Sequence, residues 1–125
     1  MKAAGGEKVF TVTAEDGDHY SVLRVSGEVG LADAVEFTRQ MQEQLTAHKA
    51  PQYLLDLNEV SRMDKAGLGV LVSLSTRLQG SGRRFVLLCP SPRVTALLTH
   101  AQIESFFPTC ESEAELKRFG KNAAK

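Results

Sequence analysis

The sequence has few of the side chains that bind metals or form disulfides. Tryptophan is absent, cysteine occurs twice and histidine three times among the 125 residues. Cys89 and Cys110 have no partners at the spacing of metal-binding motifs, so we expect two buried thiols in a reducing compartment. His19, His48 and His100 fall in three separate predicted elements, and the helix dipole accounts for His48 at a helix end. No metal site is predicted.

The motifs of common enzyme classes are also absent. There is no Gly-x-Ser-x-Gly elbow, no phosphate-binding Gly-x-x-x-x-Gly-Lys-Ser/Thr loop and no His-Glu-x-x-His pair. Gly67 and Gly69 alone fall short of the dinucleotide fingerprint. Asp56 and Asp64 could form a carboxylate pair, but nothing near them in the sequence would separate their roles as acid and base. We therefore expect no catalytic residue, no cofactor and no enzymatic activity.

The net charge and the length of the chain limit its possible partners, its location and its number of domains. Fifteen basic and fifteen acidic residues give a net charge of zero, which argues against nucleic acid or an anionic membrane as a partner. No apolar run approaches the ~20 residues of a spanning helix, and residues 1–7 lack the apolar centre of a secretory signal. We expect a cytoplasmic protein that does not insert into membranes. Its single domain should span residues 9–119, with flexible ends at 1–8 and 120–125.

The strongest local pattern is a strand followed by a helix. Residues 53–57 form a compact apolar run that begins after Pro51, and we expect this central strand to end at Asn58. After a short loop, Asp64 is placed to accept the first free N–H groups of a helix. One helix face carries a single apolar stripe: Gly67, Leu71, Leu74 and Leu78. Gly67 and Gly69 leave the first turn nearly bare, so this helix start is predicted to be a docking site.

The rest of the chain supplies elements around this unit. Before it, we predict a hairpin of strands 9–13 and 20–26 ended by Gly27, and an amphipathic helix over 32–47 with Gln40 on its outer side. After it, we predict a buried strand over 85–89 and a helix capped by Ser91. A buried connection through Ile103 and residues 106–108, with at most a short edge strand, then leads to a last helix within 112–119. This order of strands and helices implies an α/β domain with a parallel core. For Arg83 and Arg84, a solvated turn is a better explanation than an anion-binding patch.

These residues resemble a known family, the STAS domain, and within it bacterial anti-sigma factor antagonists. The resemblance runs from about Val9 to Phe119 and is carried by Asp56-Leu57-x-x-Val60-Ser61-x-Met63-Asp64-x-x-Gly67-Leu68-Gly69-Val70-Leu71, with Ser26-Gly27-Glu28 before it and Ser91-Pro92-Arg93-Val94-x-x-Leu97-Leu98 after it. It implies a mixed sheet of four or five strands, in which an N-terminal β-hairpin is followed by β-α-β-α units with helices packed on the sheet. It also implies partner switching, in which the protein binds an anti-sigma factor that is a serine kinase and so frees the sigma factor.

The sequence departs from the family pattern at its switch. The residue after the motif aspartate is usually the phosphorylated serine, but here it is Lys65, and the next position, often serine or threonine, is Ala66. A lysine has no hydroxyl to accept phosphate, and its charge is opposite to the one that phosphorylation adds. The loop after the second strand, commonly Gly-Glu-Leu-Asp, ends here in Gly30. We therefore expect a regulator that is not phosphorylated at the usual site, although Ser61 or Ser73 could have become the acceptor.

The predicted partner-binding residues lie around the helix start. They are Asp64, Lys65, Ala66, Gly67, Leu68, Gly69 and Val72. Lys65 could be an ordinary solvated lysine, or it could meet an acidic residue of a partner and contribute to specificity. Leu68 and Val72 could offer apolar area to the partner or be buried inside the domain.

Two kinds of partner fit the resemblance. In the first, the protein docks an anti-sigma factor kinase as a phosphorylation-independent antagonist. In the second, it is a STAS accessory subunit on the ATPase of an ABC-type phospholipid transport complex, a group that also tolerates a residue other than serine at the switch. The C-terminal segment from Ser91 onward favours the antagonists. The sequence is compatible with a monomer or a weak dimer.

Overall fold

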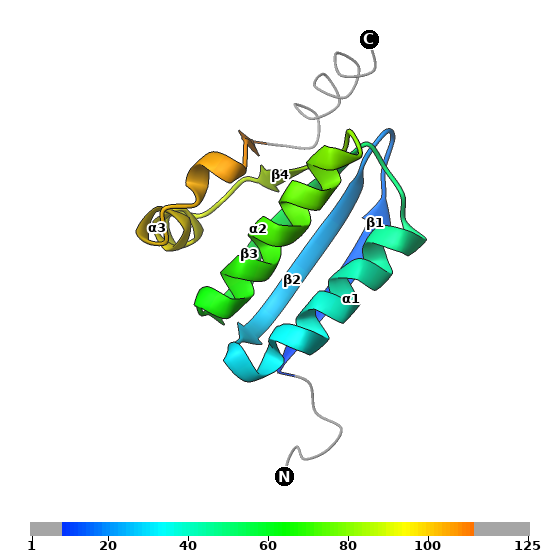
Figure 1. The fold of residues 1–125 in the computed structure, drawn as a ribbon. Coiled ribbons are helices and arrows are strands. Elements are labelled where there is room, and N and C mark those ends of the chain that lie inside the picture. Colours follow the sequence, from blue (N-terminus) through cyan, green and yellow to red (C-terminus); the bar gives the residue numbers. More distant parts are fainter. Residues whose placement is uncertain (1–8, 112–125) are drawn as a thin grey trace.

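A computed structural model describes residues 9–111 and shows one five-stranded mixed sheet (Figure 1). The strands follow chain order across the sheet: β1 (Phe10–Asp16), β2 (Ser21–Val29), β3 (Gln52–Met63), β4 (Arg84–Leu88) and β5 (Thr109–Cys110). β1 is antiparallel to β2, and the other neighbours are parallel. The expected hairpin and parallel core are confirmed. The helix predicted within 112–119 and the flexible ends at 1–8 and 120–125 lie outside the described residues.

Two long helices cover one face of the sheet. α1 (Ala34–Ala47) follows the 3-10 turn η1 (Leu31–Asp33), and α2 (Lys65–Gly80) lies beside α1 on the same face (Figure 1). The predicted stripe of α2 is buried, and α1 contributes Phe37, Met41 and Leu45 to the same core. Gln40 was predicted on the outer side of α1, but it is only 7% exposed. Its amide donates to Glu36 Oε2 at 2.9 Å, so a local hydrogen bond permits the burial.

α3 (Pro92–His100) lies apart from α1 and α2, toward the β4 side of the sheet (Figure 1). Ser91 caps it as predicted, because its hydroxyl accepts from the Val94 N–H at 3.2 Å and Pro92 occupies the first turn. The 3-10 turn η2 (Glu104–Phe106) then leads to the two-residue edge strand β5. The connection is buried at Phe107, but Phe106 is 39% exposed, contrary to prediction.

Gly27 does not end the second strand, as the sequence suggested. β2 continues to Val29, and Gly27 adopts a φ of +94° where the pairing with β3 shifts register. A Cβ at this position would lie 2.1 Å from the carbonyl oxygen of Val9, which accepts a hydrogen bond from the Glu28 N–H. Glycine is therefore required here, both for the positive φ and for the close approach of β1.

The central strand is longer than predicted. β3 does not end at Asn58 but runs to Met63, and Asp64 alone separates it from α2. The extension is made by pairing with β2, whose last residue, Val29, lies opposite Met63. Residues 58–62 are largely polar, so no apolar run marks this half of the strand, and tertiary pairing holds it extended.

Cys89 is exposed, contrary to the expectation of two buried thiols, whereas Cys110 is buried as expected. Cys89 follows the end of β4 with a φ of +44°, and its thiol donates to the carbonyl oxygen of Glu111 at 2.6 Å. The left-handed backbone turns the Cys89 side chain outward. A strand that continued to Cys89, as predicted, would have buried the side chain.

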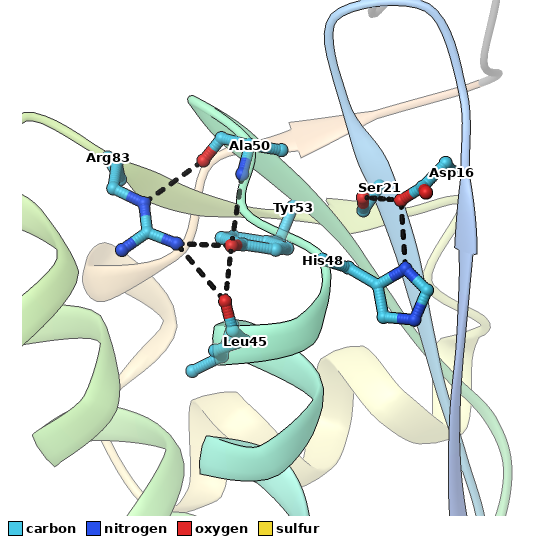
Figure 2. Close-up of polar contacts among 7 residues, drawn as sticks. All are labelled: Asp16, Ser21, Leu45, His48, Ala50, Tyr53 and Arg83. Atoms are coloured by element: carbon cyan, nitrogen blue, oxygen red, sulfur yellow. Dashed lines mark hydrogen bonds and ion pairs between the residues drawn. The ribbon is translucent and has the colours of Figure 1, made fainter.

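Arg83 makes internal hydrogen bonds near the start of β3, so neither the solvated turn nor the anion-binding patch considered from the sequence is correct. Its guanidinium donates to the carbonyl oxygens of Ala50 at 3.1 Å and Leu45 at 3.5 Å, and to the Tyr53 hydroxyl (Figure 2). It also lies 5.3 Å from the centre of the Tyr53 ring. Arg84 is half-buried and donates to Gln52 Oε1 at 2.8 and 3.0 Å. Both arginines join the start of β3 to neighbouring elements.

Asp16, at the end of β1, connects the β1–β2 hairpin to His48 at the end of α1 (Figure 2). Its Oδ1 accepts from the Ser21 hydroxyl at 2.7 Å and lies 3.0 Å from His48 Nδ1. These hydrogen bonds, the one from Ser21 foremost, lower the pKa of Asp16 below its ordinary 3.8. The ionised carboxylate therefore favours the folded state.

This lowered pKa predicts a pH dependence of stability. In the folded protein Asp16 stays ionised below pH 3.8, so its contribution is present above that value and is lost as the pH falls through the lower folded pKa. Asp16→Asn should lower the urea midpoint of unfolding at about pH 6, and the gap to the parent should narrow toward about pH 3. Asp18→Asn is the control, because the Asp18 carboxylate lies in the same turn near the exposed His19 and takes no part in the bonds to Ser21 and His48. A gap that stays constant with pH would contradict the assignment.

The two glycines in the first turns of α2 have different surroundings. A Cβ on Gly67 would lie 2.7 Å from Met63 Cγ and 3.0 Å from Val29 Cγ1, so this glycine lets the helix pack against the ends of β2 and β3. A Cβ on Gly69 would meet no atom within 4 Å. Gly67 therefore serves internal packing, and Gly69 faces open space.

The pair predicts opposite effects on stability. Gly69→Ala should raise the free energy of unfolding by about 0.5–1 kcal/mol, because alanine favours the helix and nothing obstructs its methyl group. Gly67→Ala should lower it by roughly 1 kcal/mol or more, because overpacking against Met63 and Val29 outweighs the same helix preference. Urea denaturation of both variants measures the difference. Equal stabilisation by the two alanines would show that Gly67 is not packed as described.

Candidate functional site

The predicted docking site lies where β2 and β3 end and α2 begins. The backbone N–H of Asp64 donates to the Val29 carbonyl at 3.1 Å, which ties the helix start to β2. The Asp64 side chain accepts from the N–H groups of Ala66 at 3.0 Å and Gly67 at 3.3 Å. The predicted cap is confirmed, and it leaves α2 fixed to the sheet at its first turn.

The seven predicted binding residues do not all face outward. Asp64, Lys65 and Gly69 are exposed, Ala66 and Val72 are partly buried, and Gly67 and Leu68 are buried. Leu68 is 5% exposed and belongs to the hydrophobic core, so burial is the correct one of the two alternatives left open for it. Any partner would meet the exposed side chains, while Gly67 and Leu68 hold the helix start in position.

Lys65 presents a positive charge at the first position of α2. It is exposed, and no residue among 9–111 forms an ion pair with it. A cation at this helix end opposes the macrodipole by about 0.3–1 kcal/mol when exposed. Arg62, the second-last residue of β3, is exposed as well. The positive charge of this region is therefore available to a binding partner.

Sequence analysis missed two apolar residues beside this helix start. Leu31 in η1 and Val35 in α1 are 77% and 84% exposed. η1 contacts α2, and a Cβ on the preceding Gly30 would lie 3.9 Å from Asp64 Oδ2. A signal was present, because Val35 falls outside the apolar stripe of α1. Both side chains therefore expose apolar surface on elements that contact α2.

The exposed side of α2 also borders a hollow. Lys65, Gly69 and Val72 line one wall, together with atoms of Leu68, and the other wall is the end of α3 with residues 100–103. The hollow has a volume of about 420 Å³. Val72 is half-buried at its edge, so it can still contribute apolar area to a contact.

The remaining candidates are spread over the molecule. Asp56 lies 3.5 Å from Arg24 Nε in the sheet, and its other oxygen accepts from the Asn58 N–H. Ser61 and Ser73 are both exposed. Across residues 9–111, no three histidine, cysteine or acidic side chains gather in a way that could hold a metal ion. Within the same residues, the helices are too short or too polar to span a bilayer.

Several solved structures share this fold. An anti-sigma factor antagonist from Mycobacterium paratuberculosis superposes with a TM-score of 0.73 at 21% identity, covering 90% of this chain and 94% of that chain. SpoIIAA of Bacillus in its unphosphorylated form gives 0.67 at 18% identity, covering 87% and 96%. A variant of RsbS from Moorella thermoacetica gives 0.69 at 21% identity, covering 90% and 97%. At these identities the likeness establishes the fold.

The family of the protein is established by its sequence. It matches the STAS domain over residues 11–116, which includes every described strand and helix apart from the first residue of β1. The strand–cap–helix junction at Asp64 lies in the middle of this match. The chain therefore belongs to the STAS domain family.

Proposed function

We propose that this protein is a non-catalytic regulator that binds a partner protein through the start of α2, in the manner of an anti-sigma factor antagonist, and that it is not phosphorylated at Lys65. The supporting observation is the capped, exposed helix start, where the family pattern has a serine and this chain has an exposed lysine. The similar fold of proteins described as anti-sigma factor antagonists supports the same class of partner.

Phosphorylation is the step that this site lacks. SpoIIAA has been solved in both unphosphorylated and phosphorylated forms. At the corresponding position of the motif, Lys65 offers an ammonium, which cannot form a phosphate ester and already carries charge of the opposite sign. Binding through this site would therefore be controlled by the amount of the protein.

The surroundings of Lys65 suit a protein partner better than a small molecule. Leu31 in η1 and Val35 in α1 supply exposed apolar area on elements that contact α2, and Lys65 itself lines a hollow together with Val72. Specific interfaces combine apolar contacts with charged groups that choose the partner and speed association. A cytoplasmic anti-sigma factor with serine kinase activity is the partner that we propose.

Affinity capture can test the class of partner. The full chain, carrying a tag at one end, is used to capture proteins from its source cell, in parallel with Lys65→Glu. We expect the parent to enrich an anti-sigma factor kinase and the variant to lose it. Enrichment of an ABC-type ATPase instead would establish the transport-complex alternative, and an enrichment unchanged by the variant would place the interface elsewhere.

Incubation with kinase tests whether the switch is lost. With an anti-sigma factor kinase and ATP, intact-mass spectrometry should show no added phosphate on the parent chain. Lys65→Ser restores a hydroxyl at the position and should gain one phosphate under the same conditions, which shows that the kinase is active and docks correctly. Stoichiometric labelling of the parent, at Ser61, Ser73 or elsewhere, would refute an unswitched regulator.

The affinity of the complex tests the position of the interface. Lys65→Glu should weaken binding to the purified kinase by about 1 kcal/mol or more, roughly a fivefold rise in Kd, as expected for a charge reversal at a contact. Lys49→Glu is the matched control, because Lys49 is also exposed but lies beyond the other end of β3. Titration calorimetry on both variants gives the comparison. Equal affinities for the two variants would exclude Lys65 from the interface.

A further inference from the structure

The outer half of β3 has a free edge. β2 pairs with β3 as far as Met63, but β4 pairs only with its residues 52–55. Where β4 departs, the Asn58 amide donates to the Cys89 carbonyl at 3.0 Å and holds the two strands at the point of separation. Beyond Asn58, the described part of the chain places α3, and no further strand, beside this edge.

A groove of about 390 Å³ runs between this edge and α3. We call it the α3 groove; it is lined by Leu57, Val60, Ser61, Arg62, Met63, Arg93, Val94, Ala96, Leu97 and His100. Most of these side chains are apolar. His100 also lines the hollow beside Lys65 and Val72, so the α3 groove continues toward the proposed binding surface at the start of α2.

The charges along this path have one sign. Arg62 and Arg93 line the α3 groove, Lys65 lines the adjoining hollow, and no aspartate or glutamate within residues 9–111 lines either. The whole chain is neutral, so this is a local excess of positive charge. The acidic residues nearby are Asp64, which caps α2, the exposed Glu59, and the exposed Glu28, which lies opposite Arg62 in the pairing of β2 with β3. An apolar channel with a cationic rim is complementary to acidic, amphipathic chains.

Arg93 determines what form such a chain can take. Its guanidinium donates to the carbonyl oxygens of Val60 at 2.5 Å and Ser61 at 3.3 Å, on the edge that would otherwise accept a new strand. An extended peptide would have to displace these bonds to pair with β3. A helix satisfies its own backbone groups and needs only side-chain contacts, so it is the better occupant.

We propose that the α3 groove binds an acidic amphipathic helix of the partner protein. Its apolar side chains would lie between β3 and α3, and its carboxylates would meet Arg62 and Lys65. The inference rests on the proposed function and deepens it, since it assigns a second, adjoining contact and the chemistry of the partner segment. Such a segment would be recognised by burial of apolar area, with charge deciding its identity and orientation.

A peptide titration tests the groove without the natural partner. The 15N-labelled full chain is titrated with a synthetic amphipathic helix that has leucines on one face and glutamates on the other, and with a second peptide in which lysines replace the glutamates. The acidic peptide should shift the amide resonances of residues 57–65 and 94–103 and bind roughly tenfold more tightly than the basic one, with an affinity that falls as salt rises. No shifts, shifts elsewhere, or equal binding of both peptides would overturn the proposal.

A pair of variants on α3 sharpens the test. Ala96 lines the groove and is exposed, so Ala96→Glu adds a repelling carboxylate and should weaken the acidic peptide by roughly tenfold. Thr95→Glu adds the same charge at the neighbouring exposed position, which does not line the groove, and should leave the affinity unchanged. Equal effects would overturn the proposal. If the partner still depends on Lys65 while Ala96→Glu has no effect on its capture, the groove inference fails and the proposed function stands.

Discussion

The junction at Asp64 is the constraint on which the site depends. One residue connects β3 to α2, and it makes its hydrogen bonds in both directions: the backbone N–H to Val29 of β2, and the side chain to the N–H groups of Ala66 and Gly67. Because these bonds tie the first turn of α2 to the end of β2, they fix the position of Lys65 relative to the sheet. Gly67 completes the junction, since a larger residue would collide with Met63 and Val29. The proposed binding surface is thus pre-organised by packing beneath it.

Much of the fold could be predicted because its signals are local. The apolar stripe of α2, the caps at Asp64 and Ser91, and the apolar runs of β3 and β4 each lie within a short segment, and each was found. The errors arose where tertiary contacts decide the structure. The outer half of β3 is polar and is held as a strand by pairing with β2. Gly27 lies within β2 and does not end it, and glycine is needed there because β1 approaches too closely for a side chain. Nothing within either segment encodes these neighbours.

The binding surface could be predicted only in part, for a similar reason. The motif located the helix start, but it could not separate outward from inward residues in one turn of helix, so Gly67 and Leu68 were grouped with Lys65 and Gly69. Leu31, Val35 and the α3 groove belong to other segments, which come near Lys65 only in the folded chain. Arg83 shows the same limit, because its hydrogen-bond acceptors lie thirty or more positions earlier in the sequence.

The sign of the charge at the helix start links the two proposals. A serine at this position is neutral until phosphate makes it strongly negative, so a protein with that residue can present two states to its partner. Lys65 presents one state, and its sign is the opposite of the phosphorylated one. Arg62 and Arg93 extend the same sign along the α3 groove. The partner that we propose would therefore carry negative charge. A partner surface rich in arginine, of the kind that recognises phosphate, would be repelled by this site. The loss of the switch and the preference for an acidic partner that we propose would then both follow from the same substitution.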